Sequence, residues 1–95
     1  MGAIGKMIAI RKVVLSKHHL RLGRTKHSSN GKEFPPFNSL VICQSPDGAG
    51  YFLMHICENG QAADTWHENL EDAMHQAEWE FGVQAEEWFE ANEPF

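Results

Sequence analysis

The sequence has no acidic residue before Glu33 and no lysine or arginine after Lys32. The formal net charge of −5 therefore hides a basic segment of eight lysines and arginines followed by an acidic segment of thirteen aspartates and glutamates. Globular surfaces usually intersperse the two signs, so this segregation is the strongest physical feature of the chain. The missing bases mean that cations from the N-terminal segment, or from another molecule, must compensate the later carboxylates.

Other absences limit the class of protein. The chain has two cysteines, Cys43 and Cys57, both within apolar runs, which excludes a disulfide framework and favours buried thiols in a reducing compartment. No apolar run approaches the length needed to span a bilayer. The N-terminal residues lack the sustained apolar region and cleavage site of a signal peptide. We therefore expect a cytoplasmic protein that does not insert into a membrane.

The remaining composition is that of a folded chain. With 42% hydrophobic residues in a length of 95, we expect one domain over residues 1–95. Residues 7–15 are rich in β-branched side chains and predict a strand, and residues 20–25 predict a second, weaker one. Residues 24–38 collect serine, asparagine, glycine and proline and predict a flexible loop. Residues 61–66 follow a tight Asn-Gly turn and predict a further short strand.

A β-hairpin is predicted over residues 40–57. Two apolar runs, 40–44 and 51–57, flank the turn sequence Ser-Pro-Asp-Gly-Ala-Gly. A register that pairs Gln44 with Tyr51 places Leu40 opposite His55 and leaves apolar side chains on both faces of the hairpin. A hairpin that is apolar on both faces is typical of the centre of a sheet covered on two sides.

A helix near residues 69–81 is the clearest element of the chain. Asn69 can cap it, and a glycine follows its last apolar residue. Its apolar residues follow helical spacing and form one stripe: Leu70, Ala73, Met74, Ala77 and Phe81. A second, short helix near residues 85–91 would turn Trp88 and Phe89 inward. Strands followed by helices predict an α+β fold, a small antiparallel sheet of about three to five strands packed by these helices.

The acidic helices predict a surface for binding. Trp79 points away from the apolar stripe at about 100° per residue, and an exposed tryptophan among carboxylates is typical of a protein interface. Alternatively, the short C-terminal helix folds back and buries Trp79 with Trp88 or Phe95. The predicted function is therefore protein–protein association, either self-association into a homo-oligomer or binding of a basic protein partner. The predicted contact residues are Asp72, His75, Glu78, Trp79, Glu80 and Glu87.

Two other interpretations of the charge segregation stay open. The basic segment can lie beside the acidic helices and neutralise them within one fold. Alternatively, the segment 6–32 can bind nucleic-acid phosphates, for which the candidate residues are Lys17, Arg21, Arg24, Lys26 and Lys32. The aromatic residues that would stack on bases lie elsewhere in the chain, and its net charge is acidic. Nucleic-acid binding is therefore the alternative function, behind protein association.

Candidate chemistry is sparse. His67, Glu71 and His75 would share one helical face with metal-ligand spacing if the helix began early, but the spacing is generic and solvated roles are favoured. His55 is interpreted as a core histidine with a hydrogen-bonding partner, and Ser16 lacks the sequence context of a nucleophile elbow. We predict no catalytic residue, no bound metal and no cofactor, and hence a protein that is not an enzyme.

One stretch of the chain resembles a known signature. Residues 64–83, Asp-Thr-Trp-His-Glu-Asn-Leu-Glu-Asp-Ala-Met-His-Gln-Ala-Glu-Trp-Glu-Phe-Gly-Val, followed by Glu87-Trp88, resemble the C-terminal signature of a group of small bacterial α+β proteins. Those proteins pair a short sheet with an acidic helix, and the resemblance carries no catalytic residue over to this chain. In size and charge the chain is also similar to immunity proteins that neutralise a co-encoded toxin.

Overall fold

The computed structural model describes residues 7–16, 19, 28–29, 32–33 and 37–95. Its elements are, in chain order, β1 (Ile8–Val14), β2 (Ser28–Ser29), β3 (Lys32–Glu33), β4 (Phe37–Gln44), β5 (Tyr51–Cys57), β6 (Ala62–His67), α2 (Leu70–Phe81), the 3₁₀ turn η1 (Ala85–Glu87) and β7 (Phe89–Pro94). An antiparallel sheet together with the α-helix α2 confirms the predicted α+β class. None of the described helices has the length and apolar character needed to cross a bilayer.

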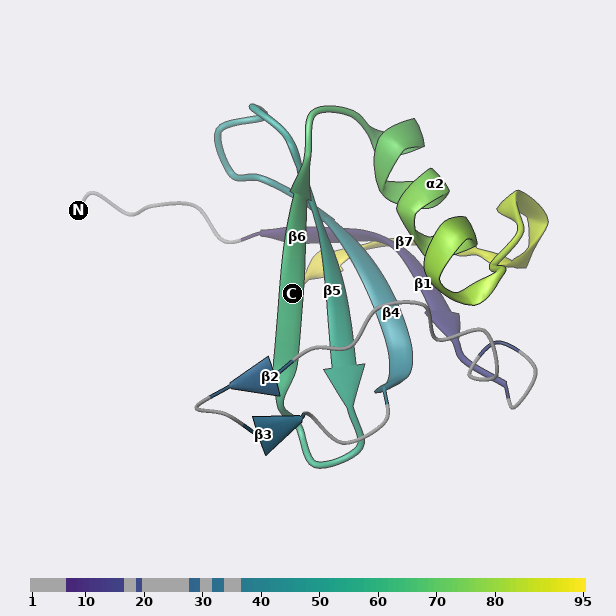
Figure 1. The fold of residues 1–95 in the computed structure, drawn as a ribbon. Helices are drawn as coiled ribbons and strands as arrows, with labels where there is room; N and C mark the ends of the chain where they lie inside the picture. The colour runs from purple at the N-terminus through teal and green to yellow at the C-terminus, as the bar shows by residue number, and fades with distance from the viewer. Residues whose placement is uncertain (1–6, 17–18, 20–27, 30–31, 34–36) are drawn as a thin grey trace.

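The main sheet has five strands in the order β6-β5-β4-β1-β7, and every neighbouring pair is antiparallel. The first and last of these strands in the sequence, β1 and β7, therefore lie side by side at one end of the sheet (Figure 1). The short strands β2 and β3 form a separate antiparallel pair. The single described α-helix, α2, lies across one face of the main sheet (Figure 1).

The strands predicted from local patterns are confirmed where the structure describes them. Residues 7–15 contain β1, and residues 61–66 correspond to β6. The β4–β5 hairpin has the predicted register, with Leu40 opposite His55. The predicted strand 20–25 lies outside the described residues, as does most of the predicted loop 24–38, apart from β2, β3 and the start of β4.

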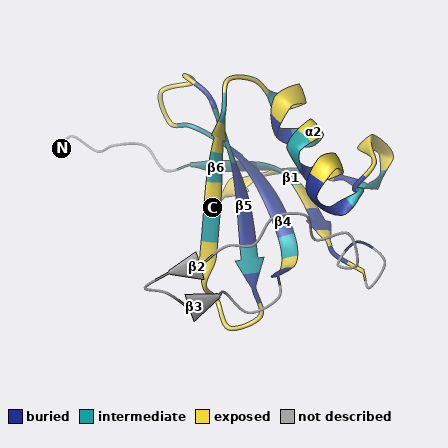
Figure 2. Ribbon diagram, viewed as in Figure 1, coloured by how far each residue is buried: buried dark blue, intermediate teal, exposed yellow. Residues whose placement is uncertain are grey.

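Helix α2 begins and ends where its sequence indicates. The side chain of Asn69 accepts a hydrogen bond of 2.9 Å from the backbone N–H of Asp72, and Gly82 ends the helix with a left-handed φ of 72°. The small side chains of Ala73 and Ala77 are fully buried and allow the helix to approach the sheet closely. Figure 2 shows the result: a buried inner side of α2 over buried central strands, and an exposed outer side.

The sheet has an apolar cluster on each face. The cluster under α2 includes Leu40, Ile42, Leu53 and Phe81, and it is the main core. The second cluster lies on the opposite face and is formed by Ala9, Val41, Cys43 and Met54, with Met7, Phe52 and Ile56 packed against it. This division follows the alternation of side chains along each strand, since Val41 and Ile42 point to opposite faces. The predicted two-sided burial of the hairpin is therefore confirmed for its central residues.

The predicted second helix at residues 85–91 is wrong. Only Ala85–Glu87 form a 3₁₀ turn, and Phe89–Pro94 form strand β7. Trp88 is buried as predicted, whereas Phe89 is 71% exposed. The reason is non-local: the outer edge of β1 offers backbone N–H and C=O groups, and pairing with that edge outweighs a weak local preference for helix.

Candidate functional site

The outer side of α2 carries most of the predicted contact residues. At about 100° per residue, its exposed positions fall within an arc of about 120°. They are Glu71, Asp72, His75, Glu78 and Trp79, and we call this set the acidic face. Trp79 is 50% exposed, which agrees with the first of the two alternatives that the sequence left open. Among the described residues, no lysine or arginine forms an ion pair with the three carboxylates of this face.

A groove borders the acidic face. It has a volume of about 360 Å³ and lies between α2 and the segment that follows it. Glu71, His75 and Glu78 line it from the helix, and Glu86 lines it from η1. Val83, which is buried, and Met74 contribute apolar surface to the same groove. The groove thus combines three carboxylates with an apolar floor, the chemistry that suits a lysine or arginine side chain with its aliphatic stem.

The prediction that Glu80 belongs to the contact surface is wrong. Glu80 is fully buried, and its Oε1 lies 2.9 Å from Nε2 of His55, which is also fully buried. Gln76 donates a second hydrogen bond of 2.9 Å to the same oxygen from one turn earlier in the helix. The physical reason is that the buried arc of α2 is centred between Ala73 and Ala77, which brings Glu80 over β5.

Glu87 is also drawn into the fold. Its Oε1 lies 2.8 Å from Nε2 of His19, which is buried, and its Oε2 accepts a hydrogen bond of 2.8 Å from the backbone N–H of Gln84. Its carboxylate is thus fixed between η1 and a residue of the basic segment. One predicted contact carboxylate is therefore used within the fold, through a histidine and not through a lysine or arginine.

Ser16, His19 and Glu87 form a hydrogen-bonded chain that resembles a serine–histidine–carboxylate arrangement. Ser16 Oγ lies 3.0 Å from Nδ1 of His19, and His19 Nε2 lies 2.8 Å from Glu87. However, the backbone N–H of Ser16 also donates to Nδ1 at 2.9 Å. That bond occupies the one in-plane lone pair that a general base would need. Both bonds from Ser16 go to the same ring nitrogen, three residues along the chain, and this arrangement supports a structural role.

The trio of possible metal ligands that an early helix start would have aligned is not formed. His67 lies at the end of β6, not on the helix, so it does not share a face with Glu71 and His75. Its Nε2 lies 2.7 Å from Thr65 Oγ1, and burial is the main cause that lowers the pKa of its imidazole. Within the described part of the chain, no group of three histidine, cysteine or carboxylate side chains has the arrangement of a metal site.

The two thiols are buried in separate places. Cys43 belongs to the cluster on the face opposite α2, and Cys57 belongs to the main core. Burial raises the pKa of the Cys43 thiol to about 11, and it raises the pKa of Cys57 as well. A thiol that holds its proton at neutral pH is a poor nucleophile and a poor metal ligand, so both cysteines act as apolar core residues.

Most of the basic residues predicted for nucleic-acid binding are not among the residues that the structure describes. Lys17, Arg21, Arg24 and Lys26 lie outside the described residues, and of Lys32 only the backbone, in β3, is described. One base nearer the N-terminus, Lys12, forms an ion pair with Glu93 of β7. The nucleic-acid interpretation thus stays a prediction.

No protein-family model, curated protein or solved structure matches the chain. The resemblance of residues 64–83 to a bacterial signature therefore stays a prediction.

Proposed function

We propose that this protein acts by protein–protein association, and that the acidic face of α2 binds a basic surface of a partner. The observation that carries the proposal is the combination on one rigid helix of three exposed carboxylates, none paired with a described lysine or arginine, with a half-exposed tryptophan. Carboxylates at the rim of an interface accelerate association with a basic surface, and a central aromatic residue supplies affinity.

The energetics of the free helix support this interpretation. Glu78 lies in the last turn of α2, where the helix dipole disfavours a negative charge by about 0.3–1 kcal/mol, and the last turn contains no basic residue. A cation from a partner would relieve that repulsion. The neighbouring groove of about 360 Å³ would accept its aliphatic stem. An immunity-like role, in which the face covers a basic toxin surface, agrees with the size and charge of the chain.

The test is a pull-down from the native host with matched charge reversals. Glu71→Lys and Glu78→Lys each change the acidic face, and Glu58→Lys makes the same change of charge in the exposed turn between β5 and β6. We expect a basic protein to be retained by the wild type and by Glu58→Lys, and lost with each of the other two. Retention that is equal in all four samples would remove the acidic face from consideration.

A second measurement follows the binding at Trp79. In a Trp66→Phe background Trp79 is the one exposed tryptophan, because Trp88 is buried. The partner should protect Trp79 from acrylamide quenching, and the affinity should fall as salt is raised because the contact is between opposite charges. Quenching that is unchanged in the complex would place the contact elsewhere.

A further inference from the structure

Strand β6 forms one open edge of the main sheet. It is the terminal strand in the order β6-β5-β4-β1-β7, and the pair β2-β3 forms a sheet of its own. No other described strand therefore pairs with the outer side of β6 (Figure 1). An open edge presents backbone N–H and C=O groups that can bind another extended chain. The residues of β6 decide which chain this edge fits.

The backbone groups of alternate residues of β6 point away from the sheet. The N–H of Cys57 donates a hydrogen bond of 2.8 Å to the carbonyl of Gln61, so the hydrogen-bonded pairs of the β5–β6 ladder continue from there in steps of two. In the observed register Ala63 and Thr65 therefore bond to β5. The residues that alternate with them are exposed and present their N–H and C=O groups outward: Ala62, Asp64 and Trp66.

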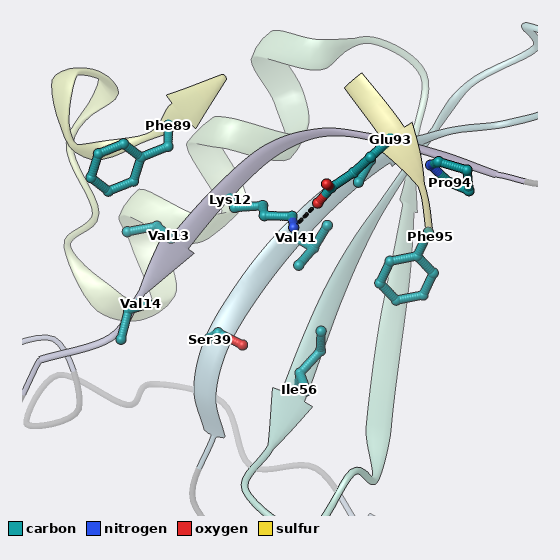
Figure 3. A pocket seen from close by; sticks show the side chains of 11 residues that line it. Lys12, Val13, Val14, Ser39, Val41, Ile56, Phe89, Glu93, Pro94 and Phe95 are labelled. Atoms are coloured by element: carbon teal, nitrogen blue, oxygen red, sulfur yellow. Dashed lines mark ion pairs between the residues drawn. The ribbon is translucent and has the colours of Figure 1, made fainter. Parts of the chain in front are cut away.

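The opposite edge of the sheet, β7, is protected against such pairing, whereas β6 is not. Strand β7 contains Pro94, which has no N–H to donate, and Glu93, which pairs with Lys12 beside a pocket of about 560 Å³ (Figure 3). The β1–β7 register is also irregular between Ala9 and Arg11. Prolines, charged side chains and bulges are the usual means of blocking a sheet edge. Strand β6 has no proline and no lysine, and its register with β5 is continuous over all six residues.

A second copy of β6 fits this edge poorly. An antiparallel, two-fold pairing that uses all three outward positions sets Asp64 directly opposite its own copy, because it lies midway between Ala62 and Trp66. Like charges directly opposite each other destabilise a pair of strands. A register that avoids this contact pairs fewer of the outward backbone groups. The edge therefore favours a strand of different sequence.

The charges beside the edge define the sequence that fits. Asp64 forms no ion pair with any lysine or arginine in the described ranges, and Glu58 and Glu68, which lie just before and just after β6, are also exposed. A lysine or arginine opposite Asp64 would form a cross-strand pair of opposite charges. A β-branched or aromatic residue opposite Trp66 would cover part of its half-exposed ring. The edge thus suits a strand that is basic at its centre.

We propose that β6 binds an extended basic segment of a protein partner by antiparallel strand addition. The segment has the pattern apolar-x-basic-x-β-branched, and these three residues lie opposite Trp66, Asp64 and Ala62 respectively. Backbone hydrogen bonds to the three outward positions supply affinity, and the basic residue supplies selectivity. The contact uses no residue of the acidic face, so it does not depend on the association proposed above.

The test is calorimetric titration of the full chain with the peptide acetyl-Thr-Val-Thr-Lys-Thr-Val-Thr-amide, for which we expect saturable binding at a ratio of one to one. Glutamate in place of its lysine should weaken binding about tenfold, because an attractive pair with Asp64 becomes a repulsive one. Asp64→Lys should reverse this preference between the two peptides. N-methylation of the two valines and the lysine keeps the charge but removes the donors that face β6, so it should abolish binding.

Variants of β6 test the backbone contact. Ala62→Pro removes one outward N–H, and proline is tolerated where the N–H of an edge strand faces solvent. It should weaken binding of the lysine peptide about threefold to tenfold, the loss of one hydrogen bond. Ala62→Ser keeps the N–H and should bind as the wild type does. Trp79→Ser changes the acidic face and should leave binding unchanged. Circular dichroism establishes that each variant is folded.

Several results would overturn the proposal. The lysine peptide could show no saturable binding at millimolar concentration. An N-methylated peptide that binds as tightly would show that charge alone holds the peptide. Binding that Ala62→Pro leaves unchanged, or that Trp79→Ser weakens equally, would place the peptide elsewhere. A wild type whose mass doubles in sedimentation equilibrium, with Ala62→Pro abolishing the dimer, would assign the edge to a second copy and reject the basic segment.

Discussion

Replacement of Glu80 by alanine should be among the most destabilising single changes in this protein, although Glu80 lies on a helix whose other acidic residues are exposed. Its carboxylate accepts hydrogen bonds from His55 and Gln76, each at 2.9 Å. His55 is enclosed by aromatic rings, with the centroid of Phe37 at 5.2 Å and that of Phe81 at 6.2 Å. Water therefore cannot replace the lost acceptor at His55 without opening the core.

The magnitude follows from burial. A buried donor that loses its acceptor costs about 1–3 kcal/mol, and breaking a buried, charge-assisted pair by removing one partner costs about 3–5 kcal/mol in total. We expect Glu80→Ala to fall in the latter range, because both members of the pair are fully buried. Glu80→Gln keeps the shape and an acceptor oxygen for His55, so it should cost about 1–2 kcal/mol.

Urea unfolding followed by circular dichroism measures these differences. The matched control is Glu78→Ala, which removes the same group from an exposed position two residues earlier and should change the free energy of unfolding by about 0.5 kcal/mol or less. Unchanged slopes of the unfolding curves would show that the variants unfold from comparable states. A loss for Glu80→Ala no larger than that for Glu78→Ala would refute the buried pair and the helix rotation that it implies.

Three further predictions concern the thiols, a histidine and a close contact. Because burial raises the pKa of Cys43 to about 11, a thiol reagent at neutral pH should modify it only after urea unfolds the protein; rapid labelling of the native protein would contradict this. Burial lowers the pKa of His67 in the fold, so the unfolded state binds more protons below about pH 6.5. Stability should therefore decline as pH falls through that value, and the decline should be smaller in His67→Gln, which urea midpoints at several pH values would measure. A Cβ at Gly50 would lie 2.5 Å from Nε1 of Trp66, so Gly50→Ala should cost about 1–3 kcal/mol, and less in a Trp66→Ala background.

Elements with local signals could be predicted from the sequence. The Pro-Asp-Gly turn fixes the β4–β5 hairpin, because Gly48 supplies the left-handed φ of 74° and Asp47 accepts a hydrogen bond of 2.9 Å from the N–H of Ala49. Helix α2 could be predicted with its cap at Asn69, because capping and the spacing of apolar residues are both local properties. In both cases the residues that decide the structure lie within a few positions of one another.

The errors arise where distant segments meet. Strand β7 forms because its backbone pairs with the edge of β1. Nothing within residues 85–91 indicates that this edge is nearby. The one local signal is Pro94, which disfavours a longer helix. Glu80 is buried because His55, on a strand far earlier in the chain, faces it. A signal for this pair does exist: each is the polar residue on an otherwise apolar face, and a buried polar group needs a partner. The rotation of α2 about its axis, which decides the pairing, depends on tertiary packing.

The segregated charge is used in two different ways, and the difference makes a final prediction. Along the sheet edge, Arg11 and Lys12 of β1 lie beside the acidic strand β7, and Lys12 pairs with Glu93. The carboxylates of α2 have no such compensation among the described residues, and Glu78 also opposes the helix dipole. Glu78→Lys should therefore stabilise the free protein by about 0.3–1 kcal/mol in urea unfolding while it weakens partner binding. A Glu78→Lys variant that is more stable but binds the partner less tightly would indicate that Glu78 serves association. A loss of stability in this variant would show instead that the charge of Glu78 is compensated within the fold.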